Sequence, residues 1–313
     1  MSSTLSPAQG AVPQVGSVAL SPTLDLSRLV YGVWRLADAP DHSPAAVARR
    51  IMSCLDQGIS TFDHADIYGD YRCETVFGDA VRANPGLKRQ MQIVTKTDIM
   101  LLSKQWPDTR VKHYDTTAAY VQGSVERSLQ RIGVDAIDLL LVHRPDPLMD
   151  AQALGACLDG LIDSGKIRAA GVSNFMPFDV TLLQSAMRHT LLTNQVEVGL
   201  MHTAPLSNGQ LAQAQQLQRP PMAWSPLGGG RLFGQEPAAL RLRPLLERLA
   251  RESNTDIGAV AVAWLLHHPA RIIPVLGSND QNRIERFSQA LQVPMDRQTW
   301  YELYELAQGA EVP

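Results

Sequence analysis

Four polar residues stand at or just after the ends of apolar runs, and their types suit proton transfer to an oxygen atom. Asp63 ends the run ISTFD, Lys96 ends MQIVTK and His143 ends IDLLLVH. Tyr68 follows Asp63 by five residues. A phenol has an ordinary pKa of about 10, and a nearby ammonium group stabilises the phenolate and lowers that pKa. The set predicts a general acid that protonates an oxygen as negative charge develops on it, as in carbonyl reduction.

The other three residues would support the phenol. An aspartate beside Lys96 keeps the ammonium charged and in place, and a histidine beside Tyr68 orients a carbonyl oxygen or relays a proton. Reduction also needs a hydride at the carbon atom, which no side chain supplies, so a nicotinamide cofactor is implied. Each residue alone has an ordinary structural explanation, such as a helix cap or a rim charge. Their origin in three strand ends and one adjoining loop favours a shared catalytic site.

These residues need a scaffold that brings strand ends together, and the chain alternates short apolar runs with helical segments eight times. We predict strands at 29–34, 59–63, 91–96, 137–143, 168–172, 193–197, 222–225 and 271–275. We predict helices at 43–57, 73–83, 115–132, 150–164, 177–188, 208–218, 238–252, 256–268, 279–291 and 296–307. In the first helix, Ser43 caps free N–H groups, Pro44 takes the first helical position and Gly58 follows the end.

Eight strand–helix units predict an α/β fold in the form of a single (β/α)8 TIM barrel. A doubly wound dinucleotide-binding sheet is disfavoured because the first strand–helix turn, at 34–37, contains no GxGxxG. The carboxyl ends of barrel strands meet at one mouth, so the four polar residues would converge there. Two long connections, 97–114 and 226–237, are expected to cover the site. We assign 1–28 to an N-terminal extension with a barrel-closing hairpin, and 29–313 to the barrel domain with extra C-terminal helices.

Composition limits the partners of this chain. It has 313 residues, 45% hydrophobic and 19% charged, with 28 basic and 31 acidic side chains. A net charge of −3 gives no electrostatic reason to expect nucleic acid or an anionic membrane as partner. Cys54, Cys73 and Cys157 fit neither a disulfide framework nor a zinc pair, and no secretory signal precedes Asp25. We expect a cytoplasmic protein with a small-molecule site; the sequence indicates no oligomeric state.

Seven segments occur in the order, and at about the spacings, of the aldo-keto reductases. They are TFDHADIYG, IVTKTDI, DLLLVHRP, GKIRAAGVSNF, TNQVE, WSPLGGGRLF and IIPVLGSNDQNRIERF. Together they span about residues 29–290, and the wording HADIYGDYRCE and HRPDPLMDA is most similar to the bacterial YdhF-like oxidoreductase branch. The resemblance implies NADP(H)-dependent reduction of aldehydes or ketones to alcohols. Tyr68 would be the general acid, with Asp63, Lys96 and His143 completing a catalytic tetrad.

The resemblance also implies a cofactor site, whose residues we name by the part of the dinucleotide they would contact. The nicotinamide would contact Ser173, Asn174 and Gln195, and the Trp224 ring would stack on it. The pyrophosphate would contact Ser225, Pro226, Leu227 and Gly229, and Arg231 could assist. The adenosine 2′-phosphate would contact Gly277, Ser278 and Arg283. Many members carry a basic residue where Gly277 stands, and Asp280 adds a negative charge nearby. NADP(H) is the expected cofactor through Arg283, with NAD(H) as the alternative.

Two tryptophans are candidate walls of the substrate pocket. Trp34 lies at the end of the first predicted strand and Trp106 lies in the long third connection. A core or loop-anchoring role fits each of them as well.

Three other functions fit parts of the same pattern. Lys96 could form a Schiff base in a barrel aldolase, although Asp63 would favour the charged ammonium over the free amine. A metal-assisted hydrolase could use Asp63, His64, Asp66 and His143, but the first strand lacks the usual HxH pair. We expect no metal. A nicotinamide-binding regulatory protein that senses redox state with little turnover would carry the same tetrad.

Overall fold

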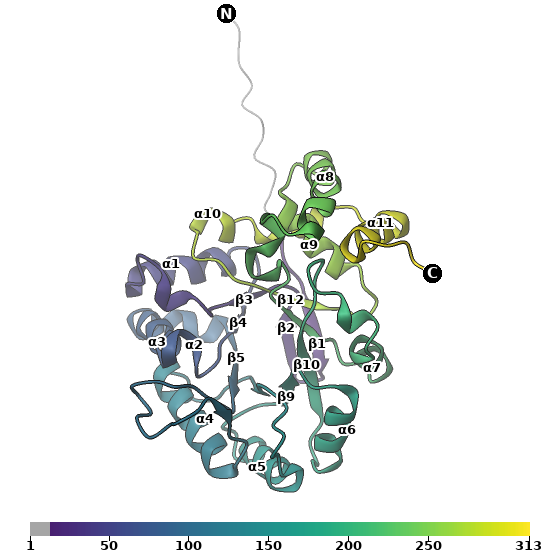
Figure 1. Ribbon diagram of the computed structural model, residues 1–313. Coiled ribbons are helices and arrows are strands. Elements are labelled where there is room, and N and C mark those ends of the chain that lie inside the picture. Colours follow the sequence, from purple (N-terminus) through teal and green to yellow (C-terminus); the bar gives the residue numbers. More distant parts are fainter. Residues whose placement is uncertain (1–12) are drawn as a thin grey trace, which may run out of the picture.

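The computed structural model describes residues 13–313, so residues 1–12 of the predicted N-terminal extension lie outside the described residues. Eight strands form the central sheet: β3 (Val30–Gly32), β4 (Thr61–Asp63), β5 (Gln92–Thr97), β8 (Leu139–Val142), β9 (Ala170–Ser173), β10 (Leu191–Glu197), β11 (Met222–Trp224) and β12 (Ile273–Leu276). They pair in parallel and close into a barrel because β12 pairs with β3. Figure 1 looks along this ring of strands, with helices around it. The predicted (β/α)8 TIM barrel is confirmed.

Several helices begin at a residue whose side chain caps them. The α-helices of eight or more residues are α1 (Pro44–Leu55), α3 (Cys73–Ala83), α4 (Ala118–Ile132), α5 (Ala151–Asp163), α6 (Pro177–Ser185), α8 (Pro237–Glu252), α9 (Ile257–Leu266) and α11 (Arg297–Gln308). The shorter ones are α2 (Tyr68–Tyr71), α7 (Gln210–Gln216) and α10 (Gln281–Ile284). Ser43 accepts a hydrogen bond from the Ala46 N–H at the start of α1, and Gly133 ends α4 with φ = 81°. These two residues use standard N-cap and C-cap chemistry.

Strand register brings the predicted catalytic residues to one end of the barrel. Asp63 is the last residue of β4 and pairs with Gly32 and Val94 on its two neighbours. Lys96 lies in β5 opposite Leu141 of β8. His143 directly follows β8, and its N–H donates to the Thr97 carbonyl at 3.0 Å. Parallel pairing with this register therefore places the three residues at the carboxyl ends of adjacent strands.

An antiparallel hairpin of β1 (Ser17–Ser21) and β2 (Leu24–Ser27) covers the opposite, amino-terminal end of the barrel. Its Leu26 is fully buried in one apolar cluster with Val30 and Leu139, the first residues of β3 and β8. The Ser27 N–H donates to Thr61 Oγ1 at 2.8 Å, which ties the hairpin to the start of β4. Within residues 13–313, this end of the barrel is thus covered by apolar packing.

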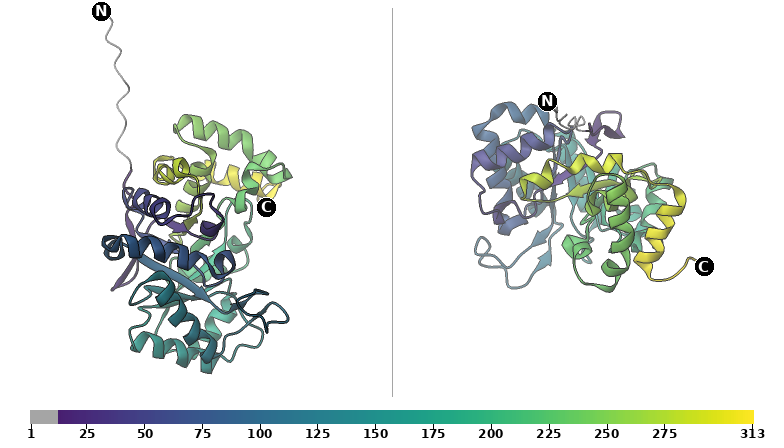
Figure 2. Two further views of the ribbon diagram at one scale, coloured as in Figure 1. Left: turned by 90° about the vertical axis from the view of Figure 1, so that its left-hand side faces the viewer. Right: turned by 90° about the horizontal axis from the view of Figure 1, so that it is seen from above.

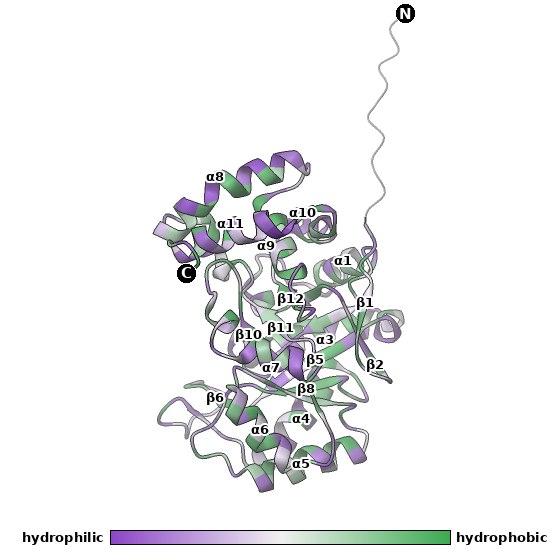
Figure 3. Ribbon diagram, turned by 90° about the vertical axis from the view of Figure 1, so that its right-hand side faces the viewer, coloured by the Kyte–Doolittle hydropathy of each residue, from purple (hydrophilic) through white to green (hydrophobic). Residues whose placement is uncertain are grey.

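The C-terminal third adds a second layer of helices on one side. α9 packs on β12 and on α8, and α8 packs in turn on α11. Figure 2 shows these C-terminal helices, green to yellow, gathered on one side of the barrel. Figure 3 shows alternating hydrophobic and hydrophilic residues along α8, as expected of a helix with one face buried. α9 reads IGAVAVAWLL and is apolar all round because it is covered on both sides. Within residues 13–313, no helix combines the length and apolar character needed to cross a bilayer.

The prediction of one continuous helix over 279–291 is wrong, because the structure has two short helical segments there. α10 ends at Ile284, and a 3-10 segment follows at Phe287–Gln292. A regular helix would join the Ser288 N–H to the Ile284 carbonyl. The buried amide of Gln57 takes both partners instead: its Nε2 donates to the Ile284 carbonyl at 2.8 Å, and its Oε1 accepts from the Ser288 N–H at 3.0 Å. A side chain from 231 residues away in sequence therefore interrupts the helix.

The connection over 97–114 contains structure that the sequence pattern did not predict. β6 (Ile99–Met100) and β7 (His113–Tyr114) pair antiparallel, so the connection is a long hairpin. The connection over 226–237 holds a 3-10 segment at Gly228–Phe233.

Candidate active site

The ammonium group of Lys96 is the centre of the site. Its Nζ donates to Asp63 Oδ1 and Oδ2 at 2.8 and 2.7 Å, and to the His64 carbonyl at 2.7 Å. It also lies 3.2 Å from the hydroxyl oxygen of Tyr68. The Lys96 side chain is completely buried and Asp63 is nearly so. The structure therefore brings the predicted acid, lysine and aspartate into one contact group.

A glycine fixes the position of Tyr68. Tyr68 begins α2, and Gly69 after it has φ = 61°. A Cβ atom on Gly69 would come within 2.7 Å of Cys73 Sγ and 2.9 Å of Ala37 Cβ. Only glycine fits this conformation and this space without rearrangement. The turn holds the Tyr68 ring 6.1 Å from the ring of His143, edge to face at 78°, so all four members of the predicted tetrad are in one place.

Burial controls the protonation of these groups. Desolvation lowers the pKa of Lys96, but the charge of Asp63 and the phenol of Tyr68 outweigh it and leave that pKa raised. Desolvation raises the pKa of Tyr68 above 10, and the opposing effect of Lys96 is smaller. Lys96 thus acts in the predicted direction by lowering the pKa of Tyr68, and burial sets the opposite overall direction of the shift. Burial, with Lys96 and Arg144 nearby, holds the pKa of His143 well below its usual value.

The nicotinamide residues named from the resemblance form a hydrogen-bonded belt across the ends of β9, β10 and β11. Ser173 Oγ donates to the Gln195 carbonyl at 2.8 Å, and Asn174 Nδ2 donates to Ser173 Oγ at 2.9 Å and to the His143 carbonyl at 3.2 Å. Trp224 Nε1 donates to Asn174 Oδ1 at 2.9 Å. Asn174 has φ = 63°, a strained conformation that these bonds hold in place.

Gln195 joins this belt to the tetrad. Its Nε2 donates to Asp63 Oδ1 at 2.8 Å, so the same carboxylate binds both Lys96 and the amide. Sequence reasoning placed Gln195 with the cofactor and missed this bond. The signal is absent from the sequence because 132 residues separate the two partners.

The glycine-rich connection after β11 has the backbone of an anion-binding turn. Ser225 and the three glycines that follow Leu227 all have positive φ, at 47° for Ser225 and at 61°, 64° and 103° for the glycines. Gly229 is exposed, and nothing lies within 4 Å of a Cβ built on it. The N–H groups of Gly228 and Gly230 donate to the Ser225 and Leu227 carbonyls at 2.7 and 3.1 Å, whereas no acceptor among the described residues pairs with the Gly229 N–H, which can meet an anion. Arg231 is held by Glu197 and Glu236 at 3.5 Å each, so its charge is already paired.

The residues predicted for the adenosine end lie on the turn after β12. Gly277 is exposed, and Ser278 Oγ accepts from the Asp280 N–H at 3.1 Å. Asp280 Oδ1 caps α10 by accepting from the N–H groups of Asn282 and Arg283 at 2.9 and 3.2 Å. The Arg283 side chain is exposed on this short helix.

Comparison with known proteins identifies the family at this point. Residues 28–308 match the model of the Aldo/keto reductase family. The chain belongs to this family. It is 53% identical over 295 residues to "6-dehydroglucose reductase" of Agrobacterium fabrum, covering 94% of this chain and 99% of the relative. It is 42% identical over 290 residues to "Oxidoreductase YdhF" of Escherichia coli, covering 92% of this chain and 96% of the relative.

A solved structure shows the same fold. A crystal structure of a thermostable aldo-keto reductase with the inhibitor epalrestat superposes with a TM-score of 0.78 at 22% identity, covering 93% of this chain and 99% of that one. The predicted resemblance to the aldo-keto reductases and to the YdhF-like oxidoreductases is confirmed, and the chain is an oxidoreductase of this family.

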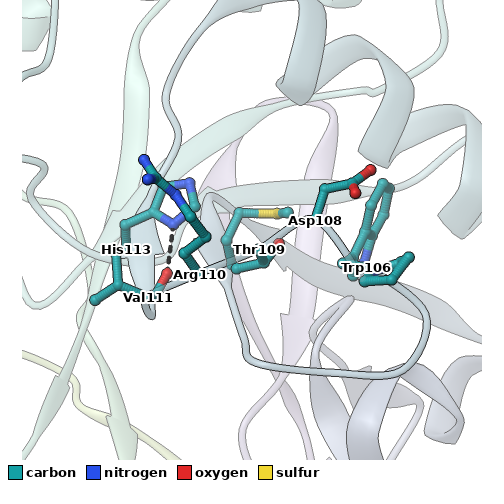
Figure 4. Close-up of a pocket in the computed structure, with 8 residues that line it drawn as sticks. Trp106, Asp108, Thr109, Arg110, Val111 and His113 are labelled. Carbon is teal, nitrogen blue, oxygen red and sulfur yellow. Dashed lines mark hydrogen bonds between the residues drawn. The ribbon is translucent and has the colours of Figure 1, made fainter.

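In this aldo/keto reductase, the two tryptophans predicted as pocket walls lie in different surroundings. Trp34 is 52% exposed, with the Arg35 guanidinium 4.7 Å from its ring. Trp106 packs on Tyr71, ring centroids 6.3 Å apart, and on the Arg127 guanidinium at 5.0 Å. It lines a pocket of about 500 Å³ on the 97–114 connection, together with Met100, Pro107, Asp108, Thr109, Arg110, Val111 and His113 (Figure 4). No member of the tetrad lines that pocket, and the role of Trp106 as a substrate-pocket wall stays a prediction.

His64 and Asp66 do not face a shared metal position. His64 packs edge to face on Phe77 at 4.5 Å, and burial lowers its pKa to about 3. Asp66 accepts from Ser124 Oγ at 2.9 Å and from the Tyr120 hydroxyl at 3.1 Å. Among the described residues, no three His, Cys, Asp or Glu side chains are grouped so as to hold a metal ion. This arrangement disfavours the hydrolase alternative.

Proposed function

We propose that this aldo/keto reductase reduces aldehydes or ketones to alcohols with NADP(H), and that Tyr68 is the general acid. The observation that carries the proposal is the position of Lys96 Nζ, bonded to both carboxylate oxygens of Asp63 and 3.2 Å from the Tyr68 hydroxyl. A buried ammonium at this distance stabilises the phenolate that forms when the tyrosine gives up its proton.

The shifted pKa values suit these roles. The raised pKa of Tyr68 keeps the phenol protonated at neutral pH, so it can donate its proton to a substrate oxygen. The raised pKa of Lys96 keeps the ammonium charged. The lowered pKa of His143 keeps its imidazole neutral, and its buried Nδ1 has no hydrogen-bond partner among the described residues. A neutral ring can donate one N–H to the carbonyl oxygen and orient it.

The residues present fit a nicotinamide dinucleotide. When bound, the nicotinamide supplies the hydride that reduces the substrate carbon. Ser173, Asn174 and Gln195 would bind the carboxamide, and the Trp224 ring would fix the orientation of the nicotinamide by stacking. The turn that contains Ser225, Pro226, Leu227 and Gly229 would bind the pyrophosphate through the Ser225 hydroxyl and the exposed Gly229 N–H. Gly277, Ser278 and Arg283 would bind the 2′-phosphate.

We further propose a sugar-derived aldehyde as the first substrate to test. Relatives named "6-dehydroglucose reductase" are 53% and 36% identical to this chain, and each alignment spans more than nine-tenths of both proteins. The side chains around the predicted acid include His143 and Arg144, whose guanidinium lies 5.8 Å from the Trp224 ring. Hydrogen-bond donors of this kind suit a hydroxyl-rich substrate better than an apolar one.

The test is loss of NADPH absorbance with 6-dehydroglucose and with a panel of simple aldehydes, ketones and quinones. We expect turnover with aldehydes, fastest with the sugar aldehyde, and slower turnover with NADH. Tight binding of NADPH without turnover of any carbonyl would contradict the enzyme assignment and favour the redox-sensing alternative.

The aldolase alternative predicts a covalent bond to Lys96. Because Lys96 already makes four polar contacts and its pKa is raised, we expect no trapped adduct when protein, carbonyl substrate and sodium borohydride are mixed. A borohydride-stable adduct on Lys96 would overturn the reductase proposal.

A further inference from the structure

The turn predicted to bind the 2′-phosphate is anchored from below by two buried side chains that the family comparison does not assign to it. The Tyr31 hydroxyl donates to the Ser278 carbonyl at 2.8 Å, and Arg50 Nε donates to the Asn279 carbonyl at 3.3 Å. Tyr31 is 1% exposed and Arg50 is 7% exposed. The two carbonyl groups of the turn are therefore directed into the protein.

This anchoring leaves the N–H groups of the turn free. Among the described residues, no hydrogen-bond acceptor pairs with the N–H of Ser278 or of Asn279. The Asp280 N–H is used by Ser278 Oγ, and Asp280 Oδ1 is used in capping α10. Ser278 and Asn279 are only half-buried, so their N–H groups can meet a ligand from the solvent side. Consecutive free N–H groups of this kind are typical of anion sites.

Arg50 is a buried cation without an anionic partner. Its terminal nitrogen Nη2 donates to the Asp41 carbonyl at 3.0 Å, and its Nη1 is buried with no hydrogen-bond partner among the described residues. No carboxylate of the described chain lies within 4.0 Å of its guanidinium. Its sequence neighbour Arg49 differs in burial and in pairing, because it is exposed and lies 3.7 Å from the Asp41 carboxylate. A buried charge with only carbonyl partners leaves a positive field that favours an anion nearby.

We propose that Arg50 is a specificity-determining residue for the 2′-phosphate of NADP(H). It positions the turn through the Asn279 carbonyl, and its buried charge, which no carboxylate of the described chain approaches within 4.0 Å, replaces the basic side chain that many family members carry where this chain has Gly277. The inference rests on the proposed function, since it deepens the cofactor assignment of the same site. It also accounts for how the turn can hold a dianion although Asp280 stands beside Arg283.

The test separates charge from hydrogen bonding at this position. Arg50→Lys keeps the charge, Arg50→Gln keeps a donor for the Asn279 carbonyl without the charge, and Arg49→Gln is the matched control on the same helix. Each protein is titrated with NADPH and NADH, and with adenosine 2′,5′-bisphosphate and adenosine 5′-monophosphate, which differ only in the 2′-phosphate. Circular dichroism and a melting curve check that each variant is folded.

We expect Arg50→Gln to raise the Kd of NADPH and of the bisphosphate about tenfold, the loss typical of one charge-assisted contact, with less than about a twofold change for NADH and the monophosphate. Arg50→Lys should recover most of the preference, and Arg49→Gln should leave all four constants unchanged. A preference retained in Arg50→Gln, or equal losses for phosphorylated and unphosphorylated ligands, would overturn the inference and leave the reductase proposal intact.

The wild-type protein gives the remaining outcomes. Binding of NADH but not of NADPH would overturn the role of Arg50 while the chain remained a reductase. Binding of neither dinucleotide would overturn both proposals.

Discussion

Lys96 is enclosed by protein on every side, whereas Arg283 projects into solvent from a four-residue helix. Both are cations that we assign to the same cofactor and substrate site, at the two ends of a dinucleotide. Lys96 stands in a barrel strand and has four polar contacts within 3.2 Å. Arg283 makes no side-chain hydrogen bond within the described residues, and it lies in α10, whose N-cap is Asp280.

The difference shows how one site divides its tasks. Proton transfer needs atoms held to a fraction of an ångström, and buried hydrogen bonds between strand ends supply that precision. Recognition of a phosphate needs charge and donors at a less exact position, so an exposed turn is sufficient. We therefore expect changes at the tetrad to affect the chemical step, and changes at the turn to affect the choice of cofactor.

The largest effect should come from Tyr68→Phe, which removes the hydroxyl 3.2 Å from Lys96 Nζ. We expect kcat for aldehyde reduction to fall by about 10²–10⁴-fold, the usual contribution of a general acid, while the Kd for NADPH changes little. Steady-state kinetics and a fluorescence titration measure the two quantities. Tyr301→Phe on the exposed face of α11 is the control. Turnover near the wild-type level would show that another group donates the proton.

The next largest effect should be on the free energy of unfolding, at the buried carboxyl of Asp66. Burial raises the pKa of Asp66 from 3.8 to about 7. The folded state then binds the proton more tightly than the unfolded state, so this carboxyl favours folding below pH 4 and loses that contribution as the pH rises toward 7. Asp66→Asn should match the wild type near pH 3.5 and exceed its free energy of unfolding at pH 8 by on the order of 2–4 kcal/mol. Urea denaturation at the two pH values checks this; a constant difference would contradict it.

Arg283→Ala tests the exposed end. We expect the Kd of NADPH to rise by about 10–100-fold, because a charge-assisted hydrogen bond to phosphate is lost, and the Kd of NADH to change by less than about threefold. Arg286→Ala, three residues further on and also exposed, is the control. Equal losses for the two dinucleotides would show that Arg283 does not bind the 2′-phosphate.

The smallest effect should come from Trp224, which lies between the two ends. Trp224→Ala removes the ring and its bond to Asn174, and we expect the Kd of NADPH and of NADH to rise by the same factor of about 2–10, the range of aromatic stacking. Trp224→Phe keeps the ring and should retain most of the affinity. A loss confined to NADPH would place Trp224 with the phosphate and contradict the stacking assignment.

The sequence predicted the barrel because its evidence is local. Caps such as Ser43, helix-ending residues such as Gly58 and eight alternating runs each act within a few residues, and polar residues at strand ends must meet at a barrel mouth. It failed for the helix over 279–291, because the interruption comes from the side chain of Gln57.

Arg50 interrupts the apolar stripe of its helix. Arg50 lies on the same face of its helix as Val47, Ile51 and Cys54, at the spacing of the buried stripe. An arginine in an apolar stripe is unusual and indicates a specific partner. The sequence could not show which partner, because Asn279 is 229 residues away.

The sequence by itself determined the element types, their order and the residues that could transfer a proton. Tertiary structure alone decided the bond of Gln195 to Asp63, the anchoring of the phosphate turn by Tyr31 and Arg50, and the direction of the pKa shift of Tyr68. The physical reason is common to all three. Hydrogen bonds across the barrel and the exclusion of water depend on which distant segments meet, and neither is encoded in the spacing of nearby residues.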